Sequence, residues 1–78
     1  MITTHPIVKE FPEFLDKIQD LYHHNEEFQV LLTTYHSLDQ EIYEIEKGEI
    51  PLDDDVLTHK RKDRVFLKDE IYNYLNKE

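Results

Sequence analysis

The N-terminal part of the chain has apolar residues separated by three and four positions, a spacing that places them on one side of a helix. Pro12 interrupts this stripe, so the pattern predicts a helix over about residues 12–23, after a loose lead-in over residues 1–6. The stripe consists of Ile7, Phe11, Phe14, Leu15, Ile18, Leu21 and Tyr22.

A second amphipathic stretch predicts a helix over about residues 26–47. Its core positions alternate steps of three and four, which is the spacing of a heptad seam. The seam consists of Phe28, Leu31, Tyr35, Leu38, Ile42 and Ile45. At about two and a half repeats it is short for an independent coiled coil but suits a packed helical hairpin.

The junction at residues 23–25 permits two interpretations. Asn25 can cap a new helix, and Glu26 and Glu27 stand where the positive end of that helix would favour them, which indicates a bend or short break. The alternative is one continuous helix, because apolar residues recur every seven positions across the junction. They are Phe14, Leu21, Phe28, Tyr35 and Ile42.

The stretch from residue 47 to residue 55 predicts a chain reversal. Gly48 suits the left-handed residue after a helix, Pro51 prevents continuation, and Asp53 to Asp55 can cap and charge the next helix. That helix is expected over about residues 54–76. Its face consists of Leu57, Lys60, Arg64, Leu67, Ile71 and Tyr74, widened by Val56, Phe66 and Leu75.

Together these patterns predict an all-α protein that forms one domain over residues 1–78. A short connection between two helices makes them antiparallel neighbours. The expected architecture is therefore an antiparallel hairpin of helices 26–47 and 54–76, with the shorter helix 12–23 packed over it or extending from it.

Charge is unevenly distributed along the chain, whose net charge is −9. Residues 28–55 carry eight acidic and one basic side chain, whereas residues 56–78 carry six basic and four acidic ones. In an antiparallel hairpin, residues whose numbers sum to about 101 lie level with each other. We therefore expect acidic and basic groups to pair across the hairpin and set its register. The acidic set is Asp39, Glu41, Glu44 and Glu46, and the basic set is Lys60, Arg61, Lys62 and Arg64.

The two long segments resemble the YdcH-like family of small bacterial proteins of unknown function. The resemblance covers about residues 11–76 and rests on "FQVLLTTYHSLDQEIYEIE" and "LTHKRKDRVFLKDEIYNYL". Its motif positions are Phe28, Leu31, His36, Leu38, Asp39, Ile42, Glu46, Lys60, Lys62 and Leu67 to Ile71. Asp63 and Arg64 depart from the pattern, where an apolar residue or a lysine is commoner. The resemblance implies a long helical hairpin and supplies no activity.

Little in the sequence indicates catalysis. The chain has no cysteine for a disulfide or a thiolate zinc site, and a single glycine cannot form a phosphate-binding loop. His36, Asp39 and His59 could approach one another as metal ligands; the alternative is a half-buried His36 hydrogen-bonded to an acid. We predict no enzyme activity, no cofactor and no metal.

The expected function is that of a non-catalytic protein–protein interaction module acting through helix–helix contacts. A two-helix hairpin leaves apolar surface bare, which favours docking on a protein partner or self-association into a homo-oligomer. Tyr43 and Tyr72 lie off the main seams and are candidate partner contacts. The alternative is a nucleic-acid-associated regulator that uses basic residues 60–64, which the net charge disfavours.

The N-terminus lacks the basic and apolar regions of a signal peptide, and no apolar run reaches the roughly 18 residues of a membrane span. The sequence therefore predicts a soluble cytoplasmic protein with no membrane contact.

Overall fold

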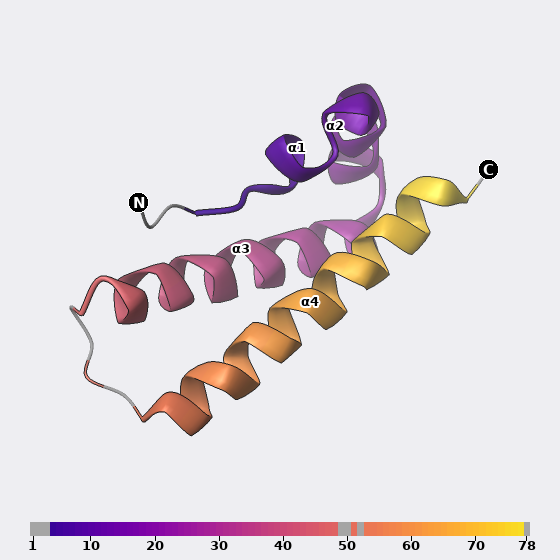
Figure 1. The fold of residues 1–78 in the computed structure, drawn as a ribbon. Helices are drawn as coiled ribbons and strands as arrows, with labels where there is room; N and C mark the ends of the chain where they lie inside the picture. The colour runs from indigo at the N-terminus through magenta and orange to yellow at the C-terminus, as the bar shows by residue number, and fades with distance from the viewer. Residues whose placement is uncertain (1–3, 49–50, 52, 78) are drawn as a thin grey trace.

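Two long helices form an antiparallel hairpin in the computed structural model, which describes residues 4–48, 51 and 53–77 (Figure 1). Helix α3 spans Glu26–Glu46 and helix α4 spans Asp54–Asn76. Both lie within a residue of their predicted bounds. The described residues contain helices and no strand, so the all-α prediction is confirmed.

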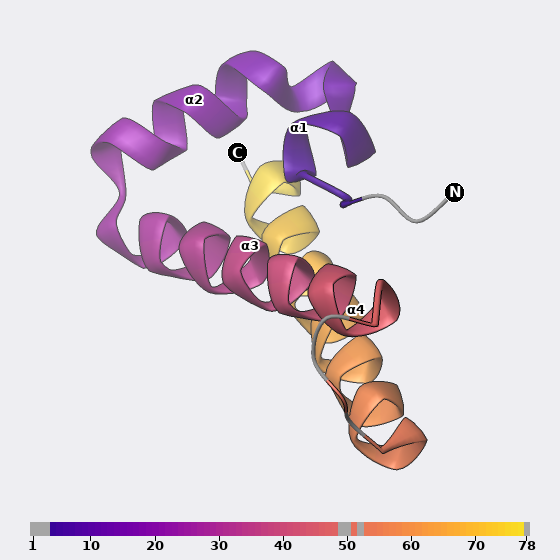
Figure 2. The same cartoon turned by 90° about the vertical axis from the view of Figure 1, so that its left-hand side faces the viewer.

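The region before the hairpin contains more helical pieces than the sequence pattern predicts. Helix α1 spans Ile7–Glu10, a single 3-10 turn follows at Pro12–Phe14, and helix α2 spans Leu15–His24. The predicted helix 12–23 is thus a 3-10 turn followed by α2, and α1 was not predicted. Figure 2 shows α2 above α3, with α1 and the C-terminal end of α4 beside them.

A break separates α2 from α3, as the capping signal at Asn25 predicts. Asn25 is extended, with φ −134° and ψ 109°, and its Oδ1 accepts a hydrogen bond of 3.0 Å from the Phe28 backbone N–H. The break allows α2 to fold back over α3, so that Ile18 is buried in the same core as Phe28. A continuous helix would have carried Ile18 away from the hairpin, and that alternative is wrong.

The chain reversal begins at Gly48, as predicted. Gly48 has φ 85°, a conformation that side chains with a Cβ rarely adopt, and its N–H donates to the Ile45 carbonyl at 3.0 Å. A Cβ at this position would meet nothing within 4 Å, so the backbone conformation alone requires glycine. Asp53 is the N-cap residue of α4, but its side chain makes no capping hydrogen bond.

The core joins all four helices, and α3 contributes the largest share. Its buried apolar members are Ile7, Ile18, Phe28, Leu32, Tyr35, Ile42, Ile45, Ile71 and Leu75. Helix α3 contacts α2 on one side and α4 on another, so its buried face is wider than the predicted seam and includes Asp39. In the predicted stripes, Leu15 and Tyr22 are exposed, and Phe66 is 63% exposed.

None of the helices in the described ranges combines the length and the apolar character that a membrane crossing requires.

The Asn25 cap gives a first prediction. Replacing Asn25 by Ala should lower the free energy of unfolding by about 1 kcal/mol, because the N–H of Phe28 loses its acceptor. Urea unfolding would measure this, with Asn25→Asp expected to retain most of the stability. Asn73→Ala, on the exposed face of α4, is the matched control; an equal loss in both Ala variants would contradict the capping role.

Candidate functional site

Three ion pairs join α3 to α4 at the level where the sequence pattern places opposite charges. Each pair links an acidic residue of α3 to a basic residue of α4. They are Lys60 Nζ with Glu41 Oε1 at 2.5 Å, Arg61 Nη2 with Glu46 Oε2 at 2.5 Å, and Arg64 Nη1 with Asp39 Oδ1 at 3.0 Å. Three of the four basic side chains in the predicted set therefore already have acidic partners within the chain.

The remaining two members of the predicted set lie elsewhere. The Glu44 carboxylate accepts a hydrogen bond of 3.3 Å from Gln40 Nε2 on the same helix rather than from α4. Lys62 is exposed on α4, and it makes no ion pair within the described part of the chain.

Asp39 differs from the other acids because it is only 3% exposed. Its Oδ1 accepts from Arg64, and its Oδ2 accepts a 2.7 Å hydrogen bond from the His5 backbone N–H. A buried carboxylate is tolerated when it is paired and hydrogen-bonded, and both conditions hold here. Asp39 thereby connects the N-terminal segment, α3 and α4 at one point.

Two neighbours of Asp39 on α3 hold the same N-terminal segment. The Tyr35 hydroxyl donates to the His5 carbonyl at 2.7 Å, and the Ile7 N–H donates to His36 Nε2 at 3.2 Å. The lead-in expected to be loose over residues 1–6 is therefore held at His5; residues 1–3 lie outside the described residues. Sequence analysis missed these contacts, because all three use backbone groups of the N-terminal segment, about which side-chain identity gives no information.

Burial controls the protonation of Tyr35 and His36. Burial raises the pKa of Tyr35 to about 12, with smaller increases from Asp39 and Glu10 and an opposing effect of Arg64. The hydroxyl therefore keeps its proton and donates. Burial lowers the pKa of His36, while the Asp39 carboxylate opposes this. Neutral His36 leaves Nε2 free of a proton, as its role as acceptor from Ile7 requires.

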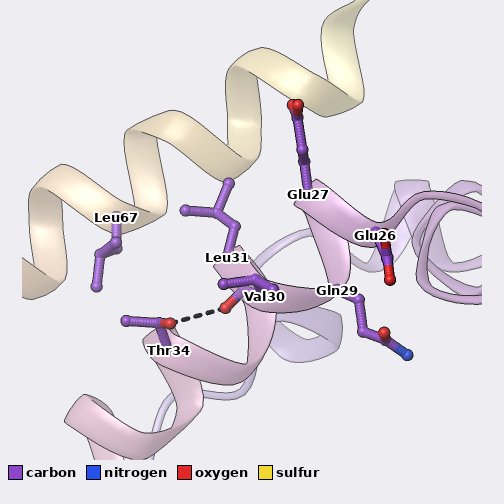
Figure 3. A pocket seen from close by; sticks show the side chains of 7 residues that line it. All are labelled: Glu26, Glu27, Gln29, Val30, Leu31, Thr34 and Leu67. Atoms are coloured by element: carbon purple, nitrogen blue, oxygen red, sulfur yellow. Dashed lines mark hydrogen bonds between the residues drawn. The ribbon is translucent and has the colours of Figure 1, made fainter.

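An open apolar groove of about 560 Å³ runs between α3 and α4 (Figure 3). Leu31 points toward α4 and Leu67 points back toward α3, so both side chains project into the space between the two helices. Val30 adds an apolar side chain that is 65% exposed. The Thr34 hydroxyl donates to the Val30 carbonyl at 2.7 Å, so its polar atom is occupied by its own helix.

Acidic side chains accompany this groove at one end. Glu26, Glu27 and Gln29 complete its lining, and both glutamates belong to the first turn of α3. The Glu27 carboxylate accepts a 2.5 Å hydrogen bond from the Tyr74 hydroxyl of α4, which raises the pKa of Tyr74. The groove therefore has an aliphatic wall and a negatively charged end.

The two tyrosines predicted as partner contacts occupy different surroundings. Tyr72 is exposed, but its ring stacks on Phe11 with centroids 5.3 Å apart, so the N-terminal segment occupies part of its surface. Tyr43 is half-buried, and the Lys47 ammonium lies 4.9 Å from its ring centroid. Neither lines the groove. Val30 does line the groove. Sequence analysis overlooked it, although an apolar residue outside the heptad seam is a signal of an exposed apolar surface.

The residues considered for metal binding do not form a cluster. His36 accepts from Ile7, and Asp39 is occupied by Arg64 and His5. Within the described ranges, no group of three or more histidine or acidic side chains could hold a metal ion.

The comparison with protein families gives a match to the hairpin. The model of a family described as "Protein of unknown function (DUF465)" matches residues 28–75. The match covers nearly all of α3 and α4 and leaves out α1 and α2. No curated protein and no solved structure matches the chain.

Asp39 gives a second prediction. Asp39→Asn should lower the free energy of unfolding by about 2 kcal/mol or more, because the half-buried Arg64 loses its counter-charge and the hydrogen bonds around His5 are weakened. Glu41→Gln, which breaks a more exposed pair, should cost no more than about 1 kcal/mol. Urea unfolding measures both, and amide exchange at His5 should accelerate only in Asp39→Asn. Equal losses in the two variants would count against this role of Asp39.

His36 gives a third prediction, on pH. Its pKa in the folded protein lies below the ordinary value of 6.5, so the unfolded chain binds the proton more readily. The contribution of neutral His36 to the free energy of unfolding is therefore fully present above pH 6.5, and it is lost as the pH falls through the folded-state pKa. His36→Gln keeps an acceptor for Ile7 but does not titrate. Comparing urea unfolding at neutral and mildly acidic pH, this variant should lose less stability on acidification than the parent protein. His59→Gln, at an exposed histidine, should behave like the parent.

Proposed function

We propose that this chain, which belongs to the DUF465 family of proteins of unknown function, is a non-catalytic protein-interaction module. The family includes the YdcH-like small proteins, so the resemblance in the sequence is confirmed. Its binding surface is the groove between α3 and α4. A helix of the partner protein lies in this groove and buries its apolar side against Val30, Leu31 and Leu67.

The exposure of Val30 is the observation that carries this proposal. A valine that is 65% exposed is not unusual alone, but Val30 adjoins Leu31 and Leu67 in a concave surface. Apolar side chains in a groove between two helices are the recognition surface that an amphipathic helix fits. Covering Val30 fully would contribute on the order of 1.5 kcal/mol to binding.

The charge arrangement supports a protein partner rather than a nucleic acid. Three of the four basic residues in the stretch 60–64 pair with acids of α3 at 2.5–3.0 Å, and a phosphate would have to displace them. Nucleic-acid binding requires surplus positive charge, whereas the chain is at −9. Lys60, Arg61 and Arg64 therefore serve the hairpin, and the groove serves the partner.

Position 30 provides the test. A photoreactive phenylalanine analogue at position 30 should crosslink to a partner protein in the native cell. The same analogue at position 65 should not, because Val65 is a similarly exposed valine (56%) that does not line the groove. Adducts from position 65 alone, or identical adducts from both positions, would refute the groove as the binding surface.

The substitution Val30→Gln gives the corresponding binding prediction. It removes the branched apolar group without changing charge, and glutamine is a good helix former. Affinity for the crosslinked partner should fall about tenfold, corresponding to about 1.4 kcal/mol, while the free energy of unfolding stays within about 0.5 kcal/mol. Val65→Gln is the matched control and should leave affinity unchanged. Isothermal titration calorimetry measures the affinities.

A further inference from the structure

The charged residues that line the groove are all acidic. Glu26 and Glu27 stand at one end of it. On the α4 side, Asp63 precedes Leu67 by four residues, which places both on the same face of that helix. Glu70 follows Leu67 by three residues and is close enough to Tyr74 to raise its pKa. Negative charge therefore borders the apolar wall on both helices.

The nearby basic residues of α4 are directed to other partners. Lys60, Arg61 and Arg64 pair with Glu41, Glu46 and Asp39, and Lys68 Nζ lies 2.9 Å from Glu10 Oε1 in α1. The Lys77 ammonium lies 4.7 Å from the centroid of the Tyr74 ring, and the hydroxyl of that ring donates to Glu27. Lys60, Arg61, Arg64 and Lys68 thus neutralise acids outside the groove, and within the described residues none of them pairs with Glu26 or Asp63.

From this charge arrangement we infer that the occupant of the groove is a cationic amphipathic helix, an inference that rests on the proposed function. Such a helix carries an aliphatic stripe at positions i, i+3 or i+4, and i+7, with lysine or arginine on both sides of the stripe. The stripe contacts Val30, Leu31 and Leu67, and the flanking cations lie beside Glu26 and Asp63. Complementary charge of this kind sets the choice and orientation of a partner.

The size of the groove limits the length of this helix. Its lining residues on α3 run from Glu26 to Thr34, which is about 12 Å of helix at 1.5 Å per residue. A partner helix of about three turns is sufficient to cover this length. The contact is therefore small, and electrostatic attraction carries a substantial share of its affinity.

A second copy of the chain fits this surface poorly. In a symmetric dimer through the groove, the same patch faces itself, so Glu26 and Asp63 of one copy would meet acids of the other. Each copy also has a net charge of −9, which adds general repulsion. Sedimentation of the protein alone at micromolar concentration should therefore show a monomer.

Three synthetic helical peptides of about 15 residues, near the length at which isolated helices become stable, test the inference. They share one leucine stripe and differ only in their flanking residues, which are lysine, glutamine or glutamate. Fluorescence anisotropy at low salt measures affinity, and NMR shift changes of Val30, Leu31 and Leu67 locate the contact. The lysine peptide should bind at least about tenfold more tightly than the glutamate peptide, and added salt should reduce the difference.

Two charge reversals on α4 provide matched controls. Asp63→Lys should weaken binding of the lysine peptide by about fivefold. Asp69→Lys makes the same change two residues beyond Leu67, on the opposite side of the helix, and should have no effect. Both residues are exposed, so neither change disturbs the core.

The outcomes separate this inference from the proposed function. Equal groove binding by all three peptides would overturn the inference while leaving the groove as a binding surface. Binding of the lysine peptide with shifts confined to other residues, or no binding of any peptide, would also overturn it. The crosslink at position 30 tests the proposed function independently, because it does not depend on the charge of the partner.

Discussion

The burial of the Asp39 carboxylate is the constraint on which the arrangement of this protein depends. The apolar core supplies most of the folding free energy, but apolar contacts alone leave the two long helices free to slide. At 3% exposure, Asp39 needs its partners, and Arg64 and the N–H of His5 satisfy it only when α4 and the N-terminal segment are correctly placed. A one-turn shift of α4 would separate Arg64 from Asp39 and bring Lys60 or Lys68 level with this carboxylate instead. The contact therefore contributes more to register than to net stability.

The sequence predicts the hairpin well because its signals are local. Asn25 acts through its capping side chain and Gly48 through its backbone conformation. From these two residues the start and the end of α3 were correctly predicted. The pairing of Asp39 with Arg64 also follows from sequence, since an antiparallel hairpin with a known turn fixes which residues lie level.

The parts that sequence could not supply are those decided by tertiary contact. Nothing in the side chain of His5 indicates that its backbone N–H and carbonyl are used by Asp39 and Tyr35. The exposure of Phe66 was also missed, because helical periodicity assigns a face to a residue but does not say how far the neighbouring helix extends over that face. The groove escaped notice for the same reason: Leu31 and Leu67 were assigned to the core seam, and the accessible surface between them depends on how α3 and α4 cross.

The position of the groove on α3 separates the proposed binding surface from the contacts of the N-terminal segment. One side of α3 faces α2 and the N-terminal segment and carries Leu32 and His36. The groove side carries Val30 and Thr34, and the two sides lie about 200° apart around the helix axis. A helix entering the groove would therefore leave the hydrogen bonds of His5 and Ile7 intact. The matched family region, residues 28–75, contains the groove and the Asp39–Arg64 pair but not α1 and α2. The proposed binding surface thus involves residues of the hairpin alone, whereas α1 and α2 pack against the other side of α3 and His5 contacts Asp39.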